Sequence, residues 1–218
     1  MSKVIEHLIE WIRTSATQAQ GLLIPMSGGS DSAVCFWLCS KAFPEKTIGV
    51  HAGRALRCKE WFEEVGRVEY TDTPGEYLER EEMRWARFLS MSLTRRYWLV
   101  GSRNRTEDQL GTYSLSSRVA TFLPLVGIWK STVMETCKEI GVPDEIIASS
   151  LRADPDCGRP GELAEIPFTL IELFLKVRMG ELSEDALTAL SEAQVIYLDG
   201  IYRRNRFKEN LPIKGLLE

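Results

Sequence analysis

The sequence predicts an α/β fold, a doubly wound parallel sheet with helices on both faces, followed by C-terminal helices. Short apolar runs that fit buried strands alternate with segments whose apolar residues recur at helical spacing. Two of these runs lead into polar, glycine-containing segments, at residues 27–32 and 101–107. Ligands bind beyond the carboxyl ends of the strands in such sheets, so both segments are candidates for a binding site.

The first half of the chain supplies the predicted sheet. Apolar residues recur at helical spacing from Ile5 to Ile12 and predict a helix over residues 3–18. Pro44 is expected to stop the helix that follows the first glycine-containing turn. The predicted strands cover residues 22–26, 47–50, 67–71 and 97–100, and the helices between them cover residues 32–42, 57–65 and 75–95.

The second half is predicted to be mostly helical. A helix over residues 130–140 is closed by Gly141, and Pro143 follows just beyond it. Residues 153–163 read as a loop rich in proline and glycine, and the tail from Arg203 is basic. Further helices are predicted over residues 168–179 and 184–199. Since no repeat or linker is visible, residues 1–218 are expected to form one domain.

The composition is that of an ordinary globular protein. The 218 residues are 44% hydrophobic and 27% charged, and the net charge of −4 gives no reason to expect a nucleic-acid partner. No apolar run reaches the roughly 18 residues of a membrane span, and the N-terminus does not read as a signal peptide. The five cysteines show no metal-binding spacing and predict reduced thiols in the cytoplasm: Cys35, Cys39, Cys58, Cys137 and Cys157.

The most informative segment is Ser27-Gly28-Gly29-Ser30-Asp31-Ser32, which directly follows the first predicted strand. Glycines let a backbone approach a ligand closely, and the free N–H groups at the start of a helix bind anions. The segment lacks the Gly-Lys-Ser/Thr of a Walker loop and the spaced glycines of a dinucleotide turn. It resembles the pyrophosphate-binding loop (PP-loop) of the ATP pyrophosphatases, which implies that it holds the phosphates of ATP.

Further segments narrow the resemblance to the ammonia-dependent NAD synthases. Residues 101–107 look like the Gly-Thr-x-Asn-x-Ser-Glu segment of that family, and residues 122–130 resemble its Ile-Asn-Pro…Lys segment. The motif that follows the next predicted helix, Gly-Val-Pro-Asp-Glu-Ile-Ile, is close to the Gly-x-Pro-Glu-x-Ile of the family, and residues 207–212 resemble its His-Lys-Arg-x-x-Pro. The resemblance covers roughly residues 20–50 and 80–215, and it implies an adenine nucleotide α-hydrolase-like fold.

The resemblance also implies roles for individual residues around ATP. Asp31 and Glu107 are expected to bind Mg²⁺, which prefers hard oxygen ligands. Lys130 is expected to stabilise the charge that develops on the departing pyrophosphate. Ser102 replaces a threonine that contacts the nucleotide in the family. Arg84 falls at the spacing of an ATP-contacting arginine, although that motif is degraded and an exposed helix face fits Arg84 and Arg87 equally well.

The part of the family pattern that recognises the acceptor acid is altered. Residues 115–121 stand where NAD synthases carry a Lys-Tyr-Gly-Asp-Gly-Gly-x-Asp segment that reads the nicotinate end of deamido-NAD. The glycines and both acidic residues are missing, and Arg118 adds a positive charge. Either the pocket is rebuilt for deamido-NAD, or the enzyme adenylates another acid. The remaining candidates for substrate contact or for a lid are Arg54, Arg152, Glu165 and Lys208.

The reaction implied by the resemblance is adenylation of a carboxylate by ATP, followed by attack of ammonia to give an amide, AMP and pyrophosphate. The chain shows no glutaminase domain, so the nitrogen is expected as free ammonia or from a separate partner. Helix-mediated homodimers are typical of the family and are expected here. The competing hypotheses are a sulfur transferase using Cys157 and a nucleotide-binding protein without an acceptor site. His51 follows a predicted strand and is read as structural.

Overall fold

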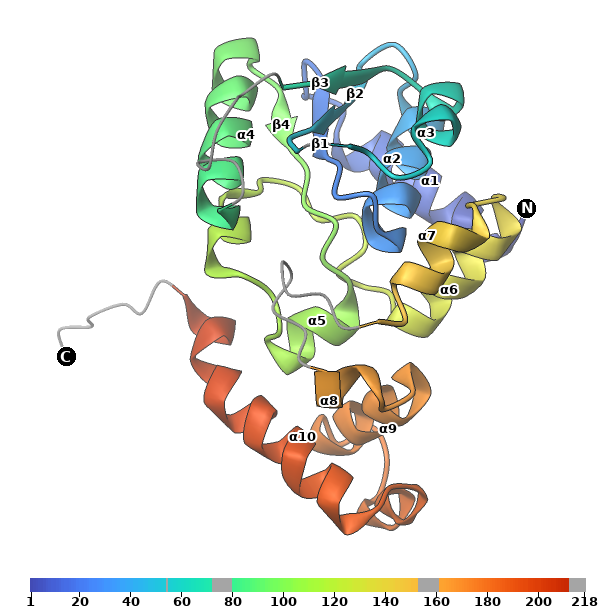
Figure 1. The fold of residues 1–218 in the computed structure, drawn as a ribbon, viewed down its shortest axis with the longest axis vertical. Helices are drawn as coiled ribbons and strands as arrows, with labels where there is room; N and C mark the ends of the chain where they lie inside the picture. The colour runs from blue at the N-terminus through green and yellow to red at the C-terminus, as the bar shows by residue number, and fades with distance from the viewer. Residues whose placement is uncertain (54, 72–79, 153–160, 212–218) are drawn as a thin grey trace, which may run out of the picture.

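Four parallel strands form the single sheet of the computed structural model, which describes residues 1–53, 55–71, 80–152 and 161–211 (Figure 1). The strand order is β3-β2-β1-β4, so the predicted α/β class with a parallel sheet is confirmed. The strands are β1 (Leu22–Pro25), β2 (Thr47–His51), β3 (Val68–Tyr70) and β4 (Trp98–Leu99).

The order of the strands places a topological switch point between β1 and β4. Leu23 of β1 pairs with Ile48 of β2 on one side and with Leu99 of β4 on the other. The chain runs outward from β1 to β3 and then returns to the opposite side of β1 for β4. Because parallel strands end at the same edge, the segments that follow β1 and β4 lie next to each other, where ligands bind in this class of fold.

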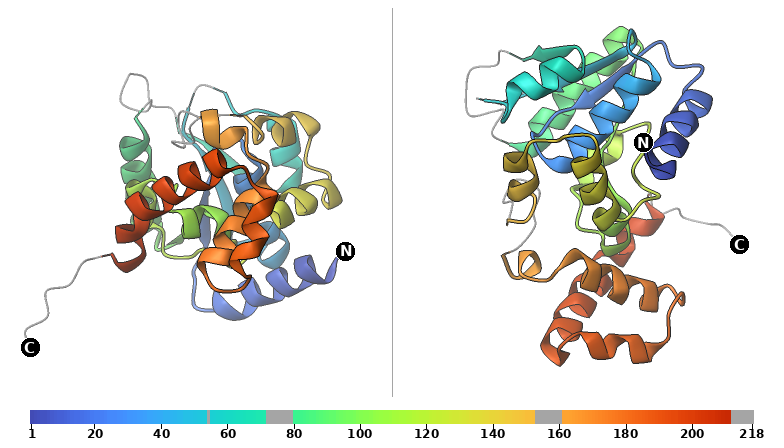
Figure 2. Two further views of the ribbon diagram at one scale, coloured as in Figure 1. Left: turned by 90° about the horizontal axis from the view of Figure 1, so that it is seen from below. Right: turned by 90° about the vertical axis from the view of Figure 1, so that its right-hand side faces the viewer.

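Helices cover both faces of the sheet, as the continuous burial of Leu22, Leu23 and Ile24 along β1 requires. Leu22 and Ile24 pack with α1 (Lys3–Ser15) and α2 (Ser30–Ala42), whereas Leu23 faces α4 (Glu81–Arg95) together with Phe88. Figure 2 shows these layers from two further directions. Successive side chains of a strand point to opposite faces, so this strand is buried on both sides. The remaining helix of this region, α3 (Lys59–Val65), also packs against α2.

A second hydrophobic core lies among the C-terminal helices, below the sheet in the view of Figure 1. It is built by α8 (Gly161–Ala164), α9 (Phe168–Arg178), the 3₁₀ segment η3 (Glu184–Ala189) and α10 (Glu192–Asn205). Phe174 is fully buried at its centre. Leu110, at the end of the short helix α5 (Arg105–Leu110), belongs to this core, so α5 lies between the two parts of the molecule.

The connection between the sheet and this second core carries the remaining elements. After α5 come the 3₁₀ segment η2 (Leu115–Val119), α6 (Lys130–Glu139) and α7 (Asp144–Ser149). After α10, the segment η4 (Arg206–Asn210) packs against α5. No helix among the described residues is long and apolar enough to span a membrane.

Several predicted boundaries are wrong, for identifiable reasons. The second helix begins at Ser30 rather than residue 32, because Gly29 provides the extended N-cap. The helix predicted over residues 184–199 is two elements, since Ser191 caps a new helix through a capping box with Gln194. The loop predicted over residues 153–163 ends earlier, because α8 begins at Gly161. The first helix ends at Ser15, and the short helices α5 and α7 were not predicted.

The close approach of α5 to α10 predicts a costly substitution. Gly111 ends α5 with φ of +70°, and a Cβ atom there would overlap the Cβ of Asn205. Gly111→Ala is therefore expected to lower the free energy of unfolding by roughly 2–4 kcal/mol, from the left-handed backbone and the clash together. Urea denaturation measures this loss.

Gly127→Ala is the matched control for that substitution. Apart from its two chain neighbours, no heavy atom of the described residues lies within 4 Å of a Cβ placed at Gly127, and its backbone is not left-handed. Its free energy of unfolding should stay within about 1 kcal/mol of the wild-type value. Equal losses in both variants would show that the contact between Gly111 and Asn205 is not tight.

Candidate functional site

The turn after β1 is held together by its own hydroxyl groups. Gly28 adopts φ of +78°, and the backbone N–H of Gly29 donates to Ser27 Oγ at 3.2 Å. Ser32 Oγ donates to the Gly29 carbonyl at 2.9 Å and lies 3.1 Å from Ser27 Oγ. The predicted phosphate loop is thus a preformed turn, and it leads directly into the N-terminus of α2, where the helix dipole favours an anion.

A buried lysine lies at the centre of the site. Lys130 is only 6% exposed, and its Nζ donates to the carboxylate of Asp31 and, at 2.7 Å, to Ser30 Oγ. Asn104 Nδ2 donates to the other carboxylate oxygen of Asp31 at 2.9 Å. Residues predicted from separate motifs therefore meet at the switch point of the sheet. Lys130 begins α6, where a cation is unfavourable beside the helix dipole, and Asp31 supplies the compensating negative charge.

Glu107 is held beside Asp31 by a capping box. Asn104 caps α5 by accepting from the Glu107 N–H at 3.0 Å, and the Glu107 carboxylate accepts from the Asn104 N–H at 3.2 Å. Burial raises the pKa of Glu107 to about 7, and the negative charge of Asp31 adds to the shift. Two carboxylates that repel each other in this way offer hard oxygen ligands to a divalent cation.

The two carboxylates of Asp31 and Glu107 suit Mg²⁺ better than a cation whose ligands must all come from protein side chains. The described residues contain no group of three or more histidine, cysteine, aspartate or glutamate side chains that could hold a metal. Mg²⁺ is commonly held by one or two carboxylates together with phosphate oxygens and water. Asp31 and Glu107 fit that pattern when a triphosphate is bound at the adjoining loop.

Glu172 organises the site from the second core, and sequence reasoning missed it. Its carboxylate is 4% exposed and accepts from the backbone N–H of Ser131 at 2.8 Å and from the Ser131 hydroxyl at 2.6 Å. It also accepts from Thr106 Oγ1 at 3.3 Å, and that hydroxyl accepts from the Lys130 N–H at 3.0 Å. Glu172 therefore fixes the helices that carry Lys130 and Glu107. Helical spacing alone places it among apolar neighbours, so only its charge within an apolar helix could have drawn attention to it.

Ser150 is a second residue that the motifs did not reveal. Its Oγ lies 2.7 Å from Ser30 Oγ and accepts from the Ser30 N–H at 3.3 Å. This contact joins the end of α7 to the first turn of α2. Arg152, a predicted substrate contact, lies two residues further along and is exposed.

His51 occupies the structural position that the sequence suggested. It is 7% exposed at the end of β2, and its Nδ1 donates to the Met26 carbonyl at 2.8 Å. That carbonyl immediately precedes the phosphate loop, so His51 supports the loop from the neighbouring strand. The His51 Nε2 atom is buried and has no hydrogen-bond partner among the described residues.

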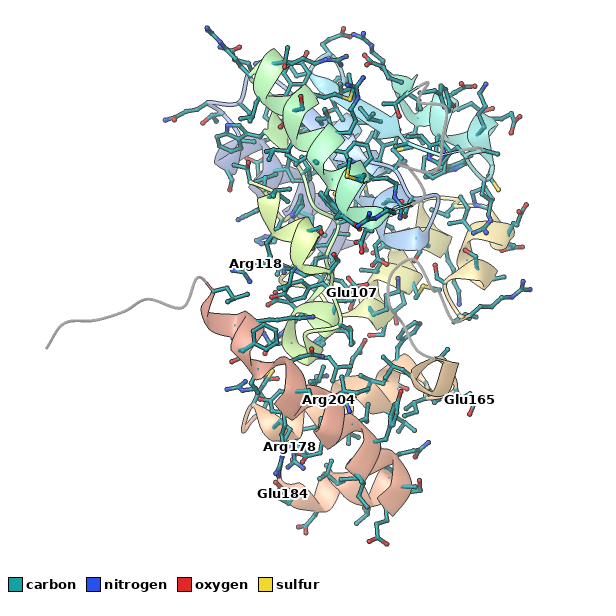
Figure 3. The ribbon with its side chains drawn as sticks, turned by 60° about the vertical axis from the view of Figure 1, so that its left-hand side comes forward. Glu107, Arg118, Glu165, Arg178, Glu184 and Arg204 are labelled. Atoms are coloured by element: carbon teal, nitrogen blue, oxygen red, sulfur yellow. The ribbon has the colours of Figure 1, made fainter. Side chains whose placement is uncertain are left out.

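The other predicted residues fall into four groups. Ser102 and Arg84 are half-buried, the first between β4 and α5 and the second on α4. Glu165 is exposed and lies apart from Glu107, as Figure 3 shows. Arg54 and Cys157 lie outside the described residues. Arg118 and Lys208 do meet, because Arg118 Nη1 donates to the Lys208 carbonyl at 2.9 Å.

Comparison with known proteins identifies a matching family and several relatives. The family model described as NAD synthase matches residues 76–212. A curated relative from Carboxydothermus hydrogenoformans, an NH(3)-dependent NAD(+) synthetase, is 28% identical over 95% of this chain and 94% of its own length. The enzyme of the same description from Pyrococcus horikoshii is 26% identical over 97% of this chain and 93% of its own length.

Solved structures show the same fold at lower identity. An NH3-dependent NAD synthetase from Campylobacter jejuni, solved with a nitrate ion, superposes with a TM-score of 0.75 at 19% identity and covers 100% of both chains. An NMN synthetase from Francisella tularensis gives a TM-score of 0.73 at 18% identity, covering 98% of this chain and 97% of its own.

The hydrogen bonds of Glu172 predict that its carboxylate is needed for the fold. Glu172→Ala leaves both groups of Ser131 without their acceptor and is expected to lower the free energy of unfolding by about 2–4 kcal/mol. Glu172→Gln should cost less, because the amide keeps one acceptor oxygen. Glu165→Ala, at an exposed carboxylate of the same region, is the control and should change little. A loss in Glu172→Ala no larger than in this control would contradict the assignment.

The raised pKa of Glu107 predicts a pH-dependent stability in metal-free buffer. The pKa in the folded state is about 7, above the ordinary value of 4.5, so the folded state binds this proton more tightly. The stability that protonation confers is complete below pH 4.5 and is lost as the pH rises through 7. Glu107→Gln cannot titrate, so its stability relative to wild type should be greater at pH 8 than at pH 5. Urea denaturation with a chelator tests this, and an unchanged difference would refute it.

Proposed function

This chain belongs to the NAD synthase family, and on that premise we propose that it amidates the nicotinate carboxylate of deamido-NAD with ammonia, at the expense of ATP. The products are NAD, AMP and pyrophosphate. The observation that carries the proposal is the meeting of Asp31, Glu107 and Lys130 beside a phosphate loop at the switch point of the sheet. The curated relatives named above, which match nearly the full length of the chain, support it.

The phosphates of ATP fit the N-terminal end of α2. The hydroxyls of Ser27, Ser30 and Ser32 surround the turn, and the helix dipole favours negative charge there. Lys130 Nζ already contacts Ser30 Oγ, so its ammonium lies at the same end of the helix. When ATP binds, this ammonium is expected to exchange part of its contact with Asp31 for phosphate oxygens.

Mg²⁺ would be held by Asp31 and Glu107, where it would neutralise charge on the triphosphate and favour the ionised form of Glu107. Asn104 orients both carboxylates, by donating to Asp31 through its amide and to Glu107 through its backbone N–H. These contacts prepare the two ligands before any substrate is present. Such preorganisation is a main source of electrostatic catalysis.

The reaction then proceeds in two displacements. A carboxylate oxygen of the acid attacks the α-phosphorus of ATP, the bond to the bridging oxygen breaks, and pyrophosphate leaves with the negative charge that Lys130 stabilises. Ammonia next attacks the acyl carbon of the adenylate, AMP departs with the electron pair of the acyl–oxygen bond, and the nitrogen loses a proton to form the amide. Positioning and charge stabilisation account for most of the rate.

We further propose a cytoplasmic homodimer, as the resemblance to NAD synthases implies. Cys35, Cys39 and Cys137 are free thiols buried among the core residues, an arrangement suited to a reducing compartment. Ile196 on α10 is 65% exposed and offers an apolar contact for a second copy. Sedimentation velocity of the wild type and of Ile196→Glu measures the assembly state, and a monomeric wild type would overturn this proposal.

The enzymatic proposal predicts turnover that depends on Lys130. Wild-type protein with ATP, Mg²⁺, ammonium and deamido-NAD should form NAD and pyrophosphate in equal amounts. Lys130→Met is expected to lower kcat by about 100-fold or more, because the charge on the leaving pyrophosphate is no longer compensated. NAD is measured by enzymatic reduction and pyrophosphate by a coupled phosphatase assay.

Lys176→Met is the matched control for this assay. Lys176 lies on α9 with its Nζ 5.4 Å from the centre of the Trp129 ring, and it makes no described contact with the site. Its kcat should stay near the wild-type value. Absence of both products with the wild type would overturn the proposed reaction, and a wild-type rate in Lys130→Met would remove Lys130 from the mechanism.

A further inference from the structure

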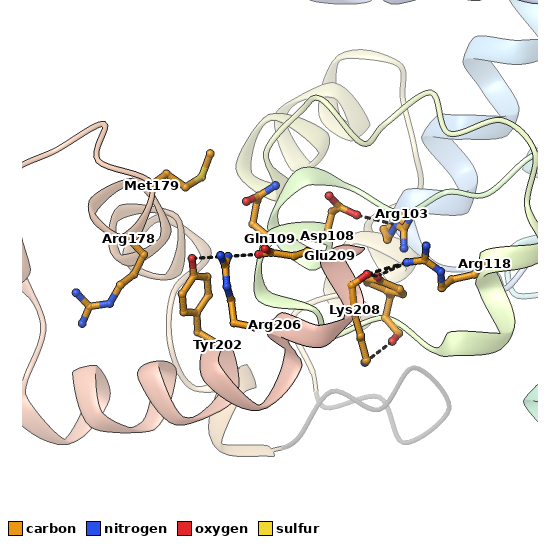
Figure 4. Close-up of a pocket in the computed structure, with 11 residues that line it drawn as sticks. Arg103, Asp108, Gln109, Arg118, Arg178, Met179, Tyr202, Arg206, Lys208 and Glu209 are labelled. Carbon is orange, nitrogen blue, oxygen red and sulfur yellow. Dashed lines mark hydrogen bonds and ion pairs between the residues drawn. The ribbon is translucent and has the colours of Figure 1, made fainter. Parts of the chain in front are cut away.

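A groove of about 620 Å³ lies beside the site, between α5 and the C-terminal helical segments (Figure 4). Its inner end begins at Arg103, which directly precedes Asn104 in the chain. Arginine and lysine side chains outnumber acidic ones along its walls. The positively charged residues that line it are Arg103, Arg118, Arg178, Arg206 and Lys208, and the negatively charged ones are Asp108 and Glu209.

Three of these cations gather around one aromatic ring at the inner end. The Arg103 guanidinium carbon lies 3.9 Å from the centre of the Tyr113 ring, and Lys208 Nζ lies 5.1 Å from it. Arg118 Nη1 donates to the Tyr113 hydroxyl at 3.0 Å. We call these four residues the cationic groove end. An aromatic ring tolerates cations over its face but does not cancel their mutual repulsion.

Little negative charge balances this cluster. The contact of Arg103 with Asp108 is an ion pair, with 3.2 Å between Nε and Oδ1. Arg118 and Lys208 instead donate to neutral backbone carbonyls, Arg118 to Leu211 at 2.8 Å and Lys208 to Gly111 at 2.6 Å. Burial lowers the pKa of Lys208, and the positive charge of Arg103 lowers it further. An anion placed between these cations would relieve that repulsion.

Some hydrogen-bond donors of the cluster have no acceptor among the described residues. The ammonium of Lys208 has three N–H groups, of which two are taken by the carbonyls of Gly111 and Tyr113. Arg103 Nη1 is buried and has no hydrogen-bond partner among the described residues. Buried donors are rarely left unsatisfied in folded proteins, so a missing acceptor is indicated here.

We propose that the cationic groove end binds a phosphoryl group of the acid that the enzyme amidates. This inference rests on the proposed function and assigns the recognition of the acceptor to residues that the family resemblance does not supply. A phosphoryl group has several oxygens, which can accept from a guanidinium and an ammonium at once. Arg103 adjoins Asn104 in sequence, so the phosphoryl group would lie next to the carboxylates that face ATP.

Arg103→Met tests the proposal, because Arg118 also holds the C-terminal segment and its loss would disturb the fold. The acceptors are deamido-NAD, nicotinate mononucleotide and nicotinate riboside, of which only the riboside has no phosphoryl group. Loss of a charge-assisted hydrogen bond should raise KM for the two phosphorylated acceptors by about tenfold to 100-fold. KM for the riboside and for ATP should change less than about twofold. Arg203→Met is the control, since Arg203 is an exposed arginine of α10 that pairs with Asp199 at 2.6 Å and does not line the groove.

Two kinetic outcomes would overturn the inference. An unchanged KM for the phosphorylated acceptors would show that the groove does not bind them. A rise in KM for ATP, or an equal rise for the riboside, would show that Arg103 acts on the nucleotide or on the fold. Thermal unfolding of both variants separates a local loss of binding from a loss of structure.

A binding measurement separates this inference from the proposed reaction. Calorimetry with α,β-methylene-ATP, which cannot release pyrophosphate, measures the affinity of each acceptor without turnover. If no acceptor is amidated but the phosphorylated ones bind through Arg103, the reaction is wrong and the phosphoryl site stands. If NAD forms while Arg103→Met binds the acceptors as well as wild type does, the reaction stands and the phosphoryl site is wrong.

Discussion

The burial of one ammonium group dictates how the two parts of this molecule meet. A lysine at 6% exposure is costly unless its charge is paired and hydrogen-bonded, and for Lys130 both contacts come from Ser30 and Asp31 of α2. Its backbone N–H is satisfied by Thr106 of α5, and Thr106 is held by Glu172 of α9. A single residue thereby requires the sheet, the connecting helices and the C-terminal core to adopt one relative arrangement.

The same contacts restrict the motion of the charged side chains that we propose as catalytic groups. Asp31 receives hydrogen bonds from both Lys130 and Asn104, which leaves its carboxylate little freedom to rotate. Glu107 is held by the capping box of α5, and burial, together with the negative charge of Asp31, raises its pKa. Asp31 therefore contacts a cation of the protein itself, whereas the carboxylate of Glu107 is held by a backbone N–H.

The features that sequence patterns predicted are those that depend on residues close together in the chain. Strand alternation, the glycine turn at residues 27–29 and the left-handed end at Gly141 followed from spacing and backbone freedom, and the motifs located Asp31, Glu107 and Lys130. Glu172 and Ser150 could not be located in this way, because their roles depend on partners 41 and 120 residues away in the chain. The interruption between η3 and α10 at Leu190 could have been predicted from the spacing of Ser191 and Gln194, which fits a capping box. It was missed because the helical periodicity of apolar residues continues across it.

The two hydrophobic cores share no residue, and this separation has an evolutionary consequence. The core that β1 shares with α1 and α2 supports the proposed phosphate loop, whereas the core of α9 and α10 supports one wall of the groove. Substitutions can accumulate in the second core and reshape that wall while the first remains packed. The polar contacts around α5 join the two cores. The groove wall can therefore change to fit a different acceptor acid while the region proposed to bind ATP stays intact.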